Sequence, residues 1–325
     1  MTQLRVLLTG RGSIAKRHAT HLRALIPDLD LAIISSTRDV HSSFFPCIIF
    51  EHLEAALAWQ PAAVVVASIS SKHTVELQTC LTLGLPCLVE KPLAVSCEQL
   101  ASLAKFGQDQ ATPTAVVVGC NLRYLPALQK LKTTLQGLTP YKVLRAHLEV
   151  GQALAQWRPQ RELKTTYSAN ATAGGGVVFD LVHEIDMARW LLGPLQAHAA
   201  VGGHFSDLPI QADDVHVALL KTRSGAPVVV SLDYVSLQAV RRYAIVTDKG
   251  TFSADIVGKR IDFQTEKNRQ ILTDSVEDFD IQKTYASQMA DWLQAIKNPK
   301  HQVMSGLADG LKTAELMLAM KKAAS

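Results

Sequence analysis

Residues 4–18, LRVLLTGRGSIAKRH, decide the fold at the start of this chain. The apolar run 6–8 predicts a buried strand, and a helix of about three turns is expected to begin at Ser13. Gly10 and Gly12 stand between them, where a missing side chain lets the backbone turn sharply and approach a ligand. The new helix offers free N–H groups and the positive end of its dipole to an anion.

The spacing Gly10-x-Gly12-x-x-Ala15 is typical of the turn that holds the pyrophosphate of a dinucleotide. Glycine pairs also occur at ordinary strand–helix turns, so a purely structural turn is the alternative. The position after a strand and before a helix favours dinucleotide binding. The residues expected to contact the cofactor in this turn are Gly10, Gly12, Ser13 and Ile14.

The second predicted strand, 29–35, ends where an NAD-binding fold usually carries Asp or Glu for the ribose 2′-hydroxyl. Here the chain has Ser35, Ser36 and Arg38 instead, and the first carboxylate is Asp39. Hydroxyl and guanidinium groups suit a 2′-phosphate, which a carboxylate would repel. These residues favour NADP(H) over NAD(H) as the cofactor. The alternative is a polar loop with an ordinary solvated arginine.

Composition restricts the class of protein. The chain has 325 residues, and the 48% that are hydrophobic suffice for two domains with substantial cores. A net charge of +4 without a block of Lys or Arg predicts no nucleic-acid partner. The five cysteines form no C-x-x-C pair, which predicts buried thiols in a reducing cytosol and neither disulfides nor a metal site. Because we find no signal peptide and no membrane-spanning apolar run, we expect a cytoplasmic protein.

Strands and helices alternate along the first part of the chain. The continuous apolar run 63–67 is typical of a parallel strand that is covered on both faces. The alternation predicts an α/β domain over residues 1–121 with a doubly wound parallel sheet. Residues 122–325 are expected to form an α+β domain with a large, open, mostly antiparallel sheet, with one strand over 142–150 and a run of strands within 197–272. The last two helices are candidates to pack back on the first domain.

Polar side chains follow several of the predicted parallel strands, at the sheet edge where ligands bind. Glu90-Lys91-Pro92 lies at one strand end, and Pro92 restricts Lys91 to an extended backbone that can hold its side chain over a cleft. A lysine beside a bound nicotinamide could donate or accept a proton, and the alternative is an ordinary surface lysine. Further candidates after strand ends, each with a structural role as the alternative, are Ser68, His73 and Asn121.

An apolar helix is predicted over residues 174–192. It carries Asp180, His183 and Asp186 at spacings that place them roughly on one face. Polar groups in such apolar company must be paired or functional, so the histidine could relay a proton while an aspartate fixes its tautomer. A satisfied structural network is the alternative. A metal site made by the histidine and two aspartates is disfavoured, because the sequence shows no tight ligand cluster. A second trio, Asp213-Asp214-x-His216, is expected to begin a strand and to be solvated.

The polar segment 151–173 carries three cations. Arg158, Arg161 and Lys164 could hold a carboxylate or phosphate of a substrate. An ordinary solvated loop is the alternative. Tyr167 in the same segment is a further candidate for substrate contact.

These features together resemble the Gfo/Idh/MocA oxidoreductase family. The resemblance covers nearly the whole chain. It is carried by TGRGSIAKRHATHL (9–22), Glu90-Lys91-Pro92, GCNLRYLP (119–126), GGGVVFDLVHEIDMARWLLG (174–193) and SGLADGLKTAELMLA (305–319). It implies a Rossmann domain followed by a domain with an open sheet, assembled as a homodimer or homotetramer. It also implies an enzyme that uses NAD(P) to oxidise or reduce a hydroxyl or ketone of a sugar, inositol or nucleotide-sugar.

The resemblance implies roles for particular residues. Lys91 matches the family's E-K-P lysine and His183 its helix-borne histidine, and both would handle the proton while Asp180 orients the sugar or His183. The cofactor contacts it implies include Glu90, Lys91 and Asn121. The substrate contacts are expected to be Lys91, Arg123, Tyr124, Arg158, Arg161, Tyr167, Asp180 and His183. The D-L-x-H-E-I-D variant resembles a subset associated with acidic and amino sugars.

Two positions depart from the family pattern. Phe179 stands where the family commonly has Asp, and Asp180 follows it. Ile69 stands where the family has Pro after the fourth strand. Some relatives use this fold as a cofactor-binding sensor or co-regulator without turnover, and others recycle bound NAD in hydrolase or lyase chemistry. Both remain alternatives to a dehydrogenase.

Overall fold

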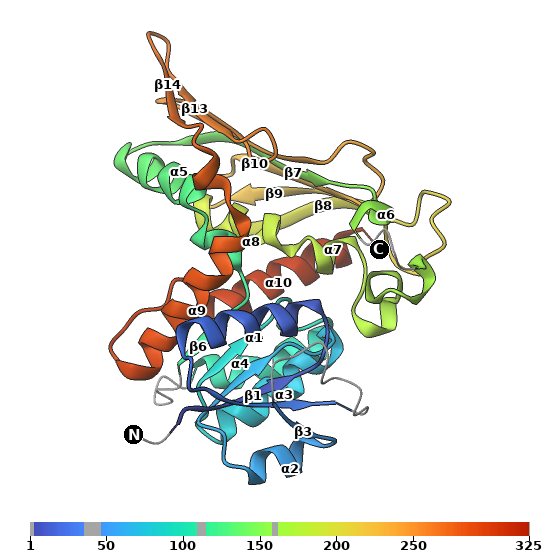
Figure 1. The fold of residues 1–325 in the computed structure, drawn as a ribbon. Helices are drawn as coiled ribbons and strands as arrows, with labels where there is room; N and C mark the ends of the chain where they lie inside the picture. The colour runs from blue at the N-terminus through green and yellow to red at the C-terminus, as the bar shows by residue number, and fades with distance from the viewer. Residues whose placement is uncertain (1–2, 36–46, 109–114, 158–161, 325) are drawn as a thin grey trace. The chain divides into compact units, whose positions relative to one another are not determined.

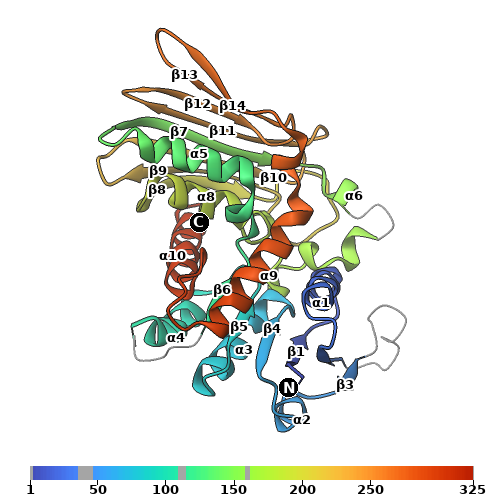
Figure 2. The ribbon, with the colours of Figure 1, turned by 60° about the vertical axis from the view of Figure 1, so that its left-hand side comes forward.

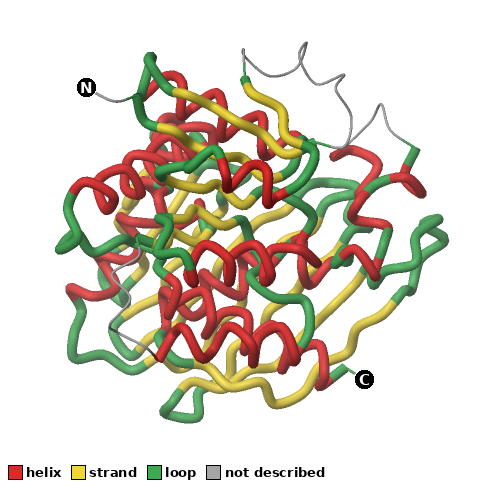
Figure 3. The backbone as a smooth tube through the Cα atoms, turned by 90° about the horizontal axis from the view of Figure 1, so that it is seen from below, coloured by secondary structure: helices red, strands yellow, loops and turns green. Residues whose placement is uncertain are grey.

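The computed structural model describes residues 3–35, 47–108, 115–157 and 162–324 (Figure 1), and the other residues are grey in Figure 3. The chain divides into two compact units. Unit 1 contains residues 1–121 and 282–311, and unit 2 contains residues 122–281 and 312–325.

Unit 1 is built on a six-stranded parallel sheet with the order β3-β2-β1-β4-β5-β6. This order confirms the predicted doubly wound sheet, because the chain reverses its direction of winding between β1 and β4. The strands are β1 (Arg5–Thr9), β2 (Asp30–Ile34), β3 (Ile48–Phe50), β4 (Ala63–Val66), β5 (Cys87–Val89) and β6 (Val116–Val118).

Helices cover the sheet of unit 1. Alternate strand residues such as Val6, Leu8 and Val65 form one core cluster with Leu22 and Trp292, so helices from two distant parts of the chain share this face. Trp292 is fully buried, and burying large apolar side chains is the main stabilising contribution here. The helices are α1 (Ser13–Leu25), α2 (Leu53–Ala58), α3 (Ser70–Thr82), α4 (Cys97–Gln108) and α9 (Ile281–Lys297).

Unit 2 is built on an eight-stranded sheet with the order β14-β13-β12-β11-β7-β10-β9-β8. Among the strand pairs that the structure describes in this sheet, β10–β7 alone is parallel, which confirms the predicted mostly antiparallel sheet. The strands are β7 (Val143–Gly151), β8 (Leu195–Gly203), β9 (Val215–Thr222), β10 (Pro227–Asp233), β11 (Val240–Thr247), β12 (Gly250–Asp255), β13 (Arg260–Gln264) and β14 (Arg269–Thr273).

One face of this sheet carries helices, and Figures 1 and 2 show α5 and α8 on the same side of it. Along β10 the residues Val228, Val230 and Leu232 are buried, while the residues between them are half-buried. This alternation is expected for a sheet with one covered and one open face. The helices of unit 2 are α5 (Pro126–Gly137), α6 (Leu154–Trp157), α7 (Val177–Asp180) and α8 (Val182–Leu192). Helix α10 (Leu307–Ala323) belongs to unit 2 from residue 312 onward.

Two sequence expectations in unit 2 are wrong. The predicted helix over 174–192 is interrupted at Leu181, whose backbone (φ −97°, ψ 25°) ends α7 and precedes α8. Apolar periodicity does not reveal this break because residues on both sides of it are buried. Asp214 and His216 do lie at the start of β9, but they are buried and not solvated. The backbone N–H groups of Phe205 and Ser206 donate to the Asp214 carboxylate, which compensates its burial.

Among the described residues, none of the helices has the length and apolar character needed to cross a membrane.

Candidate active site

The glycine turn after β1 leaves open space in front of α1. Gly10 has φ +85°, and a Cβ atom there would lie 2.5 Å from the carbonyl oxygen of Ala67, so the turn packs tightly against the end of β4. Gly12 is the residue before α1, and a Cβ atom there would meet nothing within 4 Å. An open space next to a helix N-terminus fits a phosphate. Of the predicted pyrophosphate contacts, Gly12 lies at this space, and Ser13 and Ile14 are the first two residues of α1.

The residues expected to select the adenosine ribose lie partly outside the described chain. Ser35 directly follows β2, is buried, and its N–H donates to the carbonyl of Phe50 (2.9 Å). Ser36 and Arg38 are outside the described residues. Of the three residues on which the predicted NADP preference depends, Ser35 is thus the one that the structure describes.

A carboxylate that the sequence reasoning missed connects the ends of β1 and β4. Glu76 on α3 accepts hydrogen bonds from the hydroxyls of Thr9 (2.6 Å) and Ser68 (2.8 Å) at one oxygen, Oε2. The N–H of Ala67 donates to the Thr9 hydroxyl oxygen (3.2 Å). The predicted cofactor residue Ser68 thus lies beside the glycine turn, because the Cβ of Gly10 would also approach the Cα of Ser68 to 2.8 Å.

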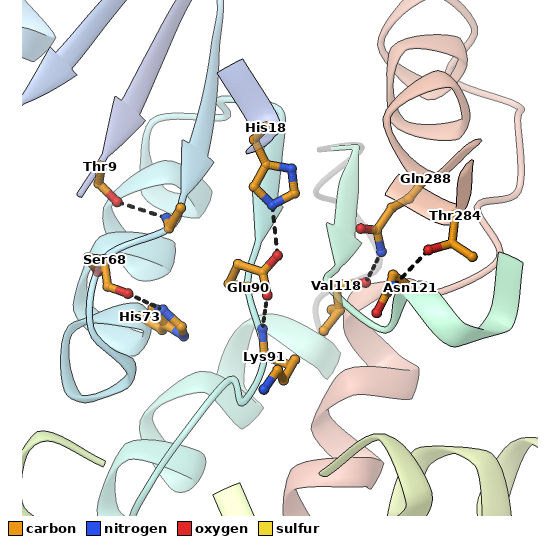
Figure 4. A network of polar contacts seen from close by, with 11 residues as sticks. Thr9, His18, Ser68, His73, Glu90, Lys91, Val118, Asn121, Thr284 and Gln288 are labelled. Atoms are coloured by element: carbon orange, nitrogen blue, oxygen red, sulfur yellow. Dashed lines mark hydrogen bonds and ion pairs between the residues drawn. The ribbon is translucent and has the colours of Figure 1, made fainter. Parts of the chain in front are cut away.

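His73 bridges two strand ends (Figure 4). It is buried, with Nε2 at 3.1 Å from the carbonyl oxygen of Ser68 and Nδ1 at 2.9 Å from that of Pro92. Thr74 donates to the next carbonyl, that of Leu93 (2.9 Å). The structure therefore brings Ser68, His73 and the turn after Lys91 together, and both ring nitrogens of His73 lie beside backbone oxygens.

Glu90 is held by a histidine that the sequence did not single out. His18 Nε2 lies 2.7 Å from Glu90 Oε1, and the backbone N–H of Lys91 approaches Glu90 Oε2 (3.3 Å; Figure 4). Burial alone would raise the pKa of Glu90, but the hydrogen bond from His18 and the positive charges of His18 and Lys91 outweigh it and lower this pKa. Lys91 itself is half-buried at the end of β5.

Asn121 lies three residues after β6, and its side chain contacts α9. Its amide donates to the hydroxyl of Thr284 (2.7 Å), and Gln288 of the same helix donates to the carbonyl of Val118 (3.1 Å; Figure 4). All these groups are buried or belong to the backbone of β6. The hydrogen bonds fasten the end of β6 to α9 within unit 1.

In unit 2, the two acidic neighbours of His183 fix α8. Asp186 receives hydrogen bonds from Nε (2.9 Å) and Nη2 (2.7 Å) of Arg123, and both side chains are buried. Glu184 accepts from the hydroxyl of Tyr243 (2.9 Å) and pairs with Arg241 (2.8 Å). Burial raises the pKa of Glu184, although its two partners act in the opposite direction. Half-buried His183 directly precedes the anchored Glu184 on α8.

Asp180 has its own partner on the sheet of unit 2. The hydroxyl of Tyr234, which follows β10, donates to Asp180 Oδ2 (2.7 Å). Burial, followed by the charge of Asp180, raises the pKa of Tyr234 well above its usual value, so this hydroxyl remains a donor. The ring of Trp157 packs edge-on against Tyr234 at 5.4 Å between centroids. Asp180 itself is half-buried.

The other predicted substrate contacts lie in different environments. Tyr124 is buried, and the hydroxyl of half-buried Tyr167 donates to the carbonyl of Gly174 (2.5 Å). Lys164 is exposed. Arg158 and Arg161 are outside the described residues.

Some of these partners had a signal in the sequence and others had none. Glu76 lies three residues after His73, so both occupy one face of a helix that starts at a strand end. That spacing could have indicated it. Thr9, His18 and Tyr234 carry no such signal, because each meets its partner only through contacts of high sequence separation.

Two family models match the chain. "Oxidoreductase family, NAD-binding Rossmann fold" matches residues 4–119, and "GFO/IDH/MocA C-terminal domain" matches residues 143–253. The chain is similar to inositol 2-dehydrogenase of Mycolicibacterium smegmatis, with 26% identity over 261 residues, which cover 77% of this chain and 72% of the relative. It is also similar to the rhizopine catabolism protein MocA of Rhizobium meliloti, 28% identical over 130 residues, 40% of this chain and 38% of the relative.

Solved structures share the fold over nearly the whole length. Levoglucosan dehydrogenase in complex with NADH and levoglucosan aligns with a TM-score of 0.83 at 18% identity and covers 99% of this chain and 97% of that one. A myo-inositol dehydrogenase from Corynebacterium glutamicum aligns with a TM-score of 0.75 at 20% identity, with coverage of 99% and 97%. The family models, the glycine turn and the two sheets lead to one conclusion: this chain belongs to the GFO/IDH/MocA family and is an NAD(P)-dependent oxidoreductase.

Proposed function

We propose that this enzyme transfers a hydride between a nicotinamide cofactor and a carbon that bears a hydroxyl or ketone group on a sugar, inositol or nucleotide-sugar. The observation that carries the proposal is the placement of half-buried Lys91 at the carboxyl end of β5, in the sheet matched by the NAD-binding family model. The names of the relatives, which include inositol 2-dehydrogenase and levoglucosan dehydrogenase, support a polyol or sugar as the substrate. Within that class, the D-L-x-H-E-I-D variant (180–186) favours acidic or amino sugars.

Lys91 and His183 are the proposed proton carriers. A hydroxyl that loses a hydride from its carbon must also lose the proton from its oxygen, so a general base is needed within reach of that oxygen. We assign this direct contact to Lys91, which returns the proton when a ketone is reduced. His183 is the second proton-handling group. When bound, the nicotinamide ring accepts or donates the hydride.

Asp180 orients the sugar or His183 in this proposal. The hydrogen bond from Tyr234 fixes one oxygen of its carboxylate, so the other oxygen has a defined direction. A fixed orientation speeds the reaction, because the entropy lost in positioning the group is lost on folding and not during the reaction step. Arg123 donates twice to Asp186, so its proposed contribution is to hold α8 and with it His183.

Two finer features complete the proposal. NADP(H) is preferred over NAD(H), because Ser35 and the residues after it lack the carboxylate that binds a ribose 2′-hydroxyl. An anionic group of the substrate is held by Arg158, Arg161 and Lys164. Michaelis constants for both cofactors test the first feature, and a clear preference for NADH would contradict it.

The experiment for the main proposal follows the absorbance of the reduced nicotinamide while the protein meets a panel of sugars, inositols, uronic acids and amino sugars. A net change with one class is the expected result. Tight retention of the cofactor with product but without net change would instead support hydrolase or lyase chemistry with recycled NAD. Binding without any product would support a sensor or co-regulator. Either of these results would overturn the dehydrogenase proposal.

A further inference from the structure

Glu76 lies where the two halves of the parallel sheet in unit 1 meet. Its Oε2 accepts from Thr9, the last residue of β1, and from Ser68, two residues after β4. These two strands are neighbours at the centre of the sheet. In a doubly wound fold a dinucleotide binds across this point, outside the carboxyl ends of the strands. The carboxylate therefore belongs to the edge over which the cofactor lies.

The hydrogen-bond donors and acceptors at this edge determine which ligand groups can bind there. A carboxylate only accepts hydrogen bonds, and each hydroxyl has a single hydrogen to donate. The N–H of Ala67 donates to the oxygen of Thr9 (3.2 Å), which leaves the hydroxyl hydrogen of Thr9 for Glu76. The hydrogen of Ser68 is likewise given to Glu76, at 2.8 Å. Neither hydroxyl has a hydrogen left for a ligand, so a ligand here must itself be a donor.

The second carboxylate oxygen of Glu76, Oε1, can still accept hydrogen bonds. Within the part of the chain that the structure describes, Oε1 of Glu76 accepts no hydrogen bond and no cation pairs with this carboxylate. Glu76 is half-buried. A carboxylate without a cation repels phosphate, so the neighbouring pyrophosphate is not its partner.

The donors that a dinucleotide offers are its ribose hydroxyls, its adenine amine and its carboxamide amine. The adenosine half belongs to the β1–β3 side of the sheet and the nicotinamide half to the β4–β6 side. We infer that Glu76 is a further cofactor-binding residue, whose Oε1 accepts a hydrogen bond from a hydroxyl of the nicotinamide ribose. This inference deepens the proposed function and rests on its NAD(P) site.

The test compares ADP with ADP-ribose, because ADP-ribose adds that ribose and lacks the nicotinamide. Both affinities are measured calorimetrically on the full-length protein. Glu76→Ala is expected to weaken ADP-ribose binding about tenfold while ADP binding stays within about twofold. Glu76→Gln keeps an acceptor oxygen but loses the charge, so a smaller loss of about threefold is expected. Glu54→Gln, an exposed residue on α2 of the same unit, is the matched control and should change neither affinity.

Three other results would overturn the assignment of Glu76 to the nicotinamide ribose. Equal weakening of ADP and ADP-ribose would show that Glu76 only clamps the strand ends, and it would overturn the inference. Weakened NADP binding with unchanged ADP-ribose binding would place the contact at the carboxamide and overturn the ribose assignment. If neither ADP nor ADP with a 2′-phosphate binds the wild-type protein, the nucleotide site itself fails, and the proposed function fails with it.

Discussion

At the scale of single residues, the groups proposed to move protons depend on neighbours that hold them. Lys91 follows a glutamate anchored by His18 and precedes a proline whose carbonyl lies against His73. His183 stands between Val182 and Glu184, both buried, on a helix fixed by ion pairs. Such support keeps a reacting group within the narrow range of positions that proton transfer needs.

Replacing Lys91 by Met tests its role directly. Methionine keeps a long apolar side chain but cannot exchange a proton, so turnover should fall to less than about a tenth of the wild-type value. Cofactor affinity should stay close to wild type, because the pyrophosphate turn is untouched. Steady-state kinetics and titration with reduced cofactor measure the two quantities. Turnover above about a tenth of wild type would refute the role.

Glu90 predicts a dependence of stability on pH. Its pKa in the folded protein lies below the ordinary value of 4.5, so the native state favours its ionised form. The stability this contributes is present in full above the unfolded-state pKa and is lost as pH falls through the lower folded-state pKa. Glu90→Gln should therefore cost about 1 to 3 kcal/mol of unfolding free energy near neutral pH. In urea unfolding, this difference should shrink at about pH 4 and below. An unchanged difference would contradict the assignment.

At the scale of elements, the β1–α1 turn contains two glycines, one needed for the fold and one proposed to bind the cofactor. Gly10 has a positive φ and touches the end of β4, whereas Gly12 faces open space with φ −71°. The backbone conformation requires the first glycine, and we propose that the bound phosphate requires the second. The spacing of the motif predicts a role for both positions, and the contacts of Gly10 with Ala67 and Ser68 distinguish it from Gly12.

Because the two glycines differ in this way, an alanine variant at Gly10 should lose stability, whereas one at Gly12 should lose cofactor affinity. Gly10→Ala should lower the free energy of unfolding by about 1 to 3 kcal/mol, because it combines strain at positive φ with a clash against backbone atoms. Gly12→Ala should leave stability within about 0.5 kcal/mol and still weaken cofactor binding, because its methyl group occupies the phosphate space. Urea unfolding and cofactor titration of both variants make the comparison. Loss of stability in Gly12→Ala would contradict it.

At the scale of the whole molecule, the open face of the sheet in unit 2 bears on assembly. Val201 on β8 and Val217 on β9 are paired in register and exposed, at 68% and 41%. Exposed apolar pairs on a sheet face favour contact with another surface. A homodimer or homotetramer is what the family resemblance implies.

The mass in solution tests this. Light scattering should give two or four times the chain mass of 35.4 kDa, because the apolar face is then removed from water. Val217→Lys places a charge on that face and should shift the population toward monomer. Lys221→Glu, a change of an already charged and exposed residue on the same strand, is the control. A wild-type protein that is monomeric at every concentration would contradict the prediction.

The sequence alone determined the succession of elements, the parallel and antiparallel sheets, the glycine turn and the candidates Lys91 and His183. These follow from local rules: hydrophobic periodicity, glycine at turns, and the position of polar residues after strands. The tertiary structure decided which groups are paired: Glu90 with His18, Asp186 with Arg123, and Glu76 with Thr9 and Ser68. It also decided the break at Leu181. Such pairings join residues far apart along the chain, so their energies depend on burial and distance, which no local pattern encodes.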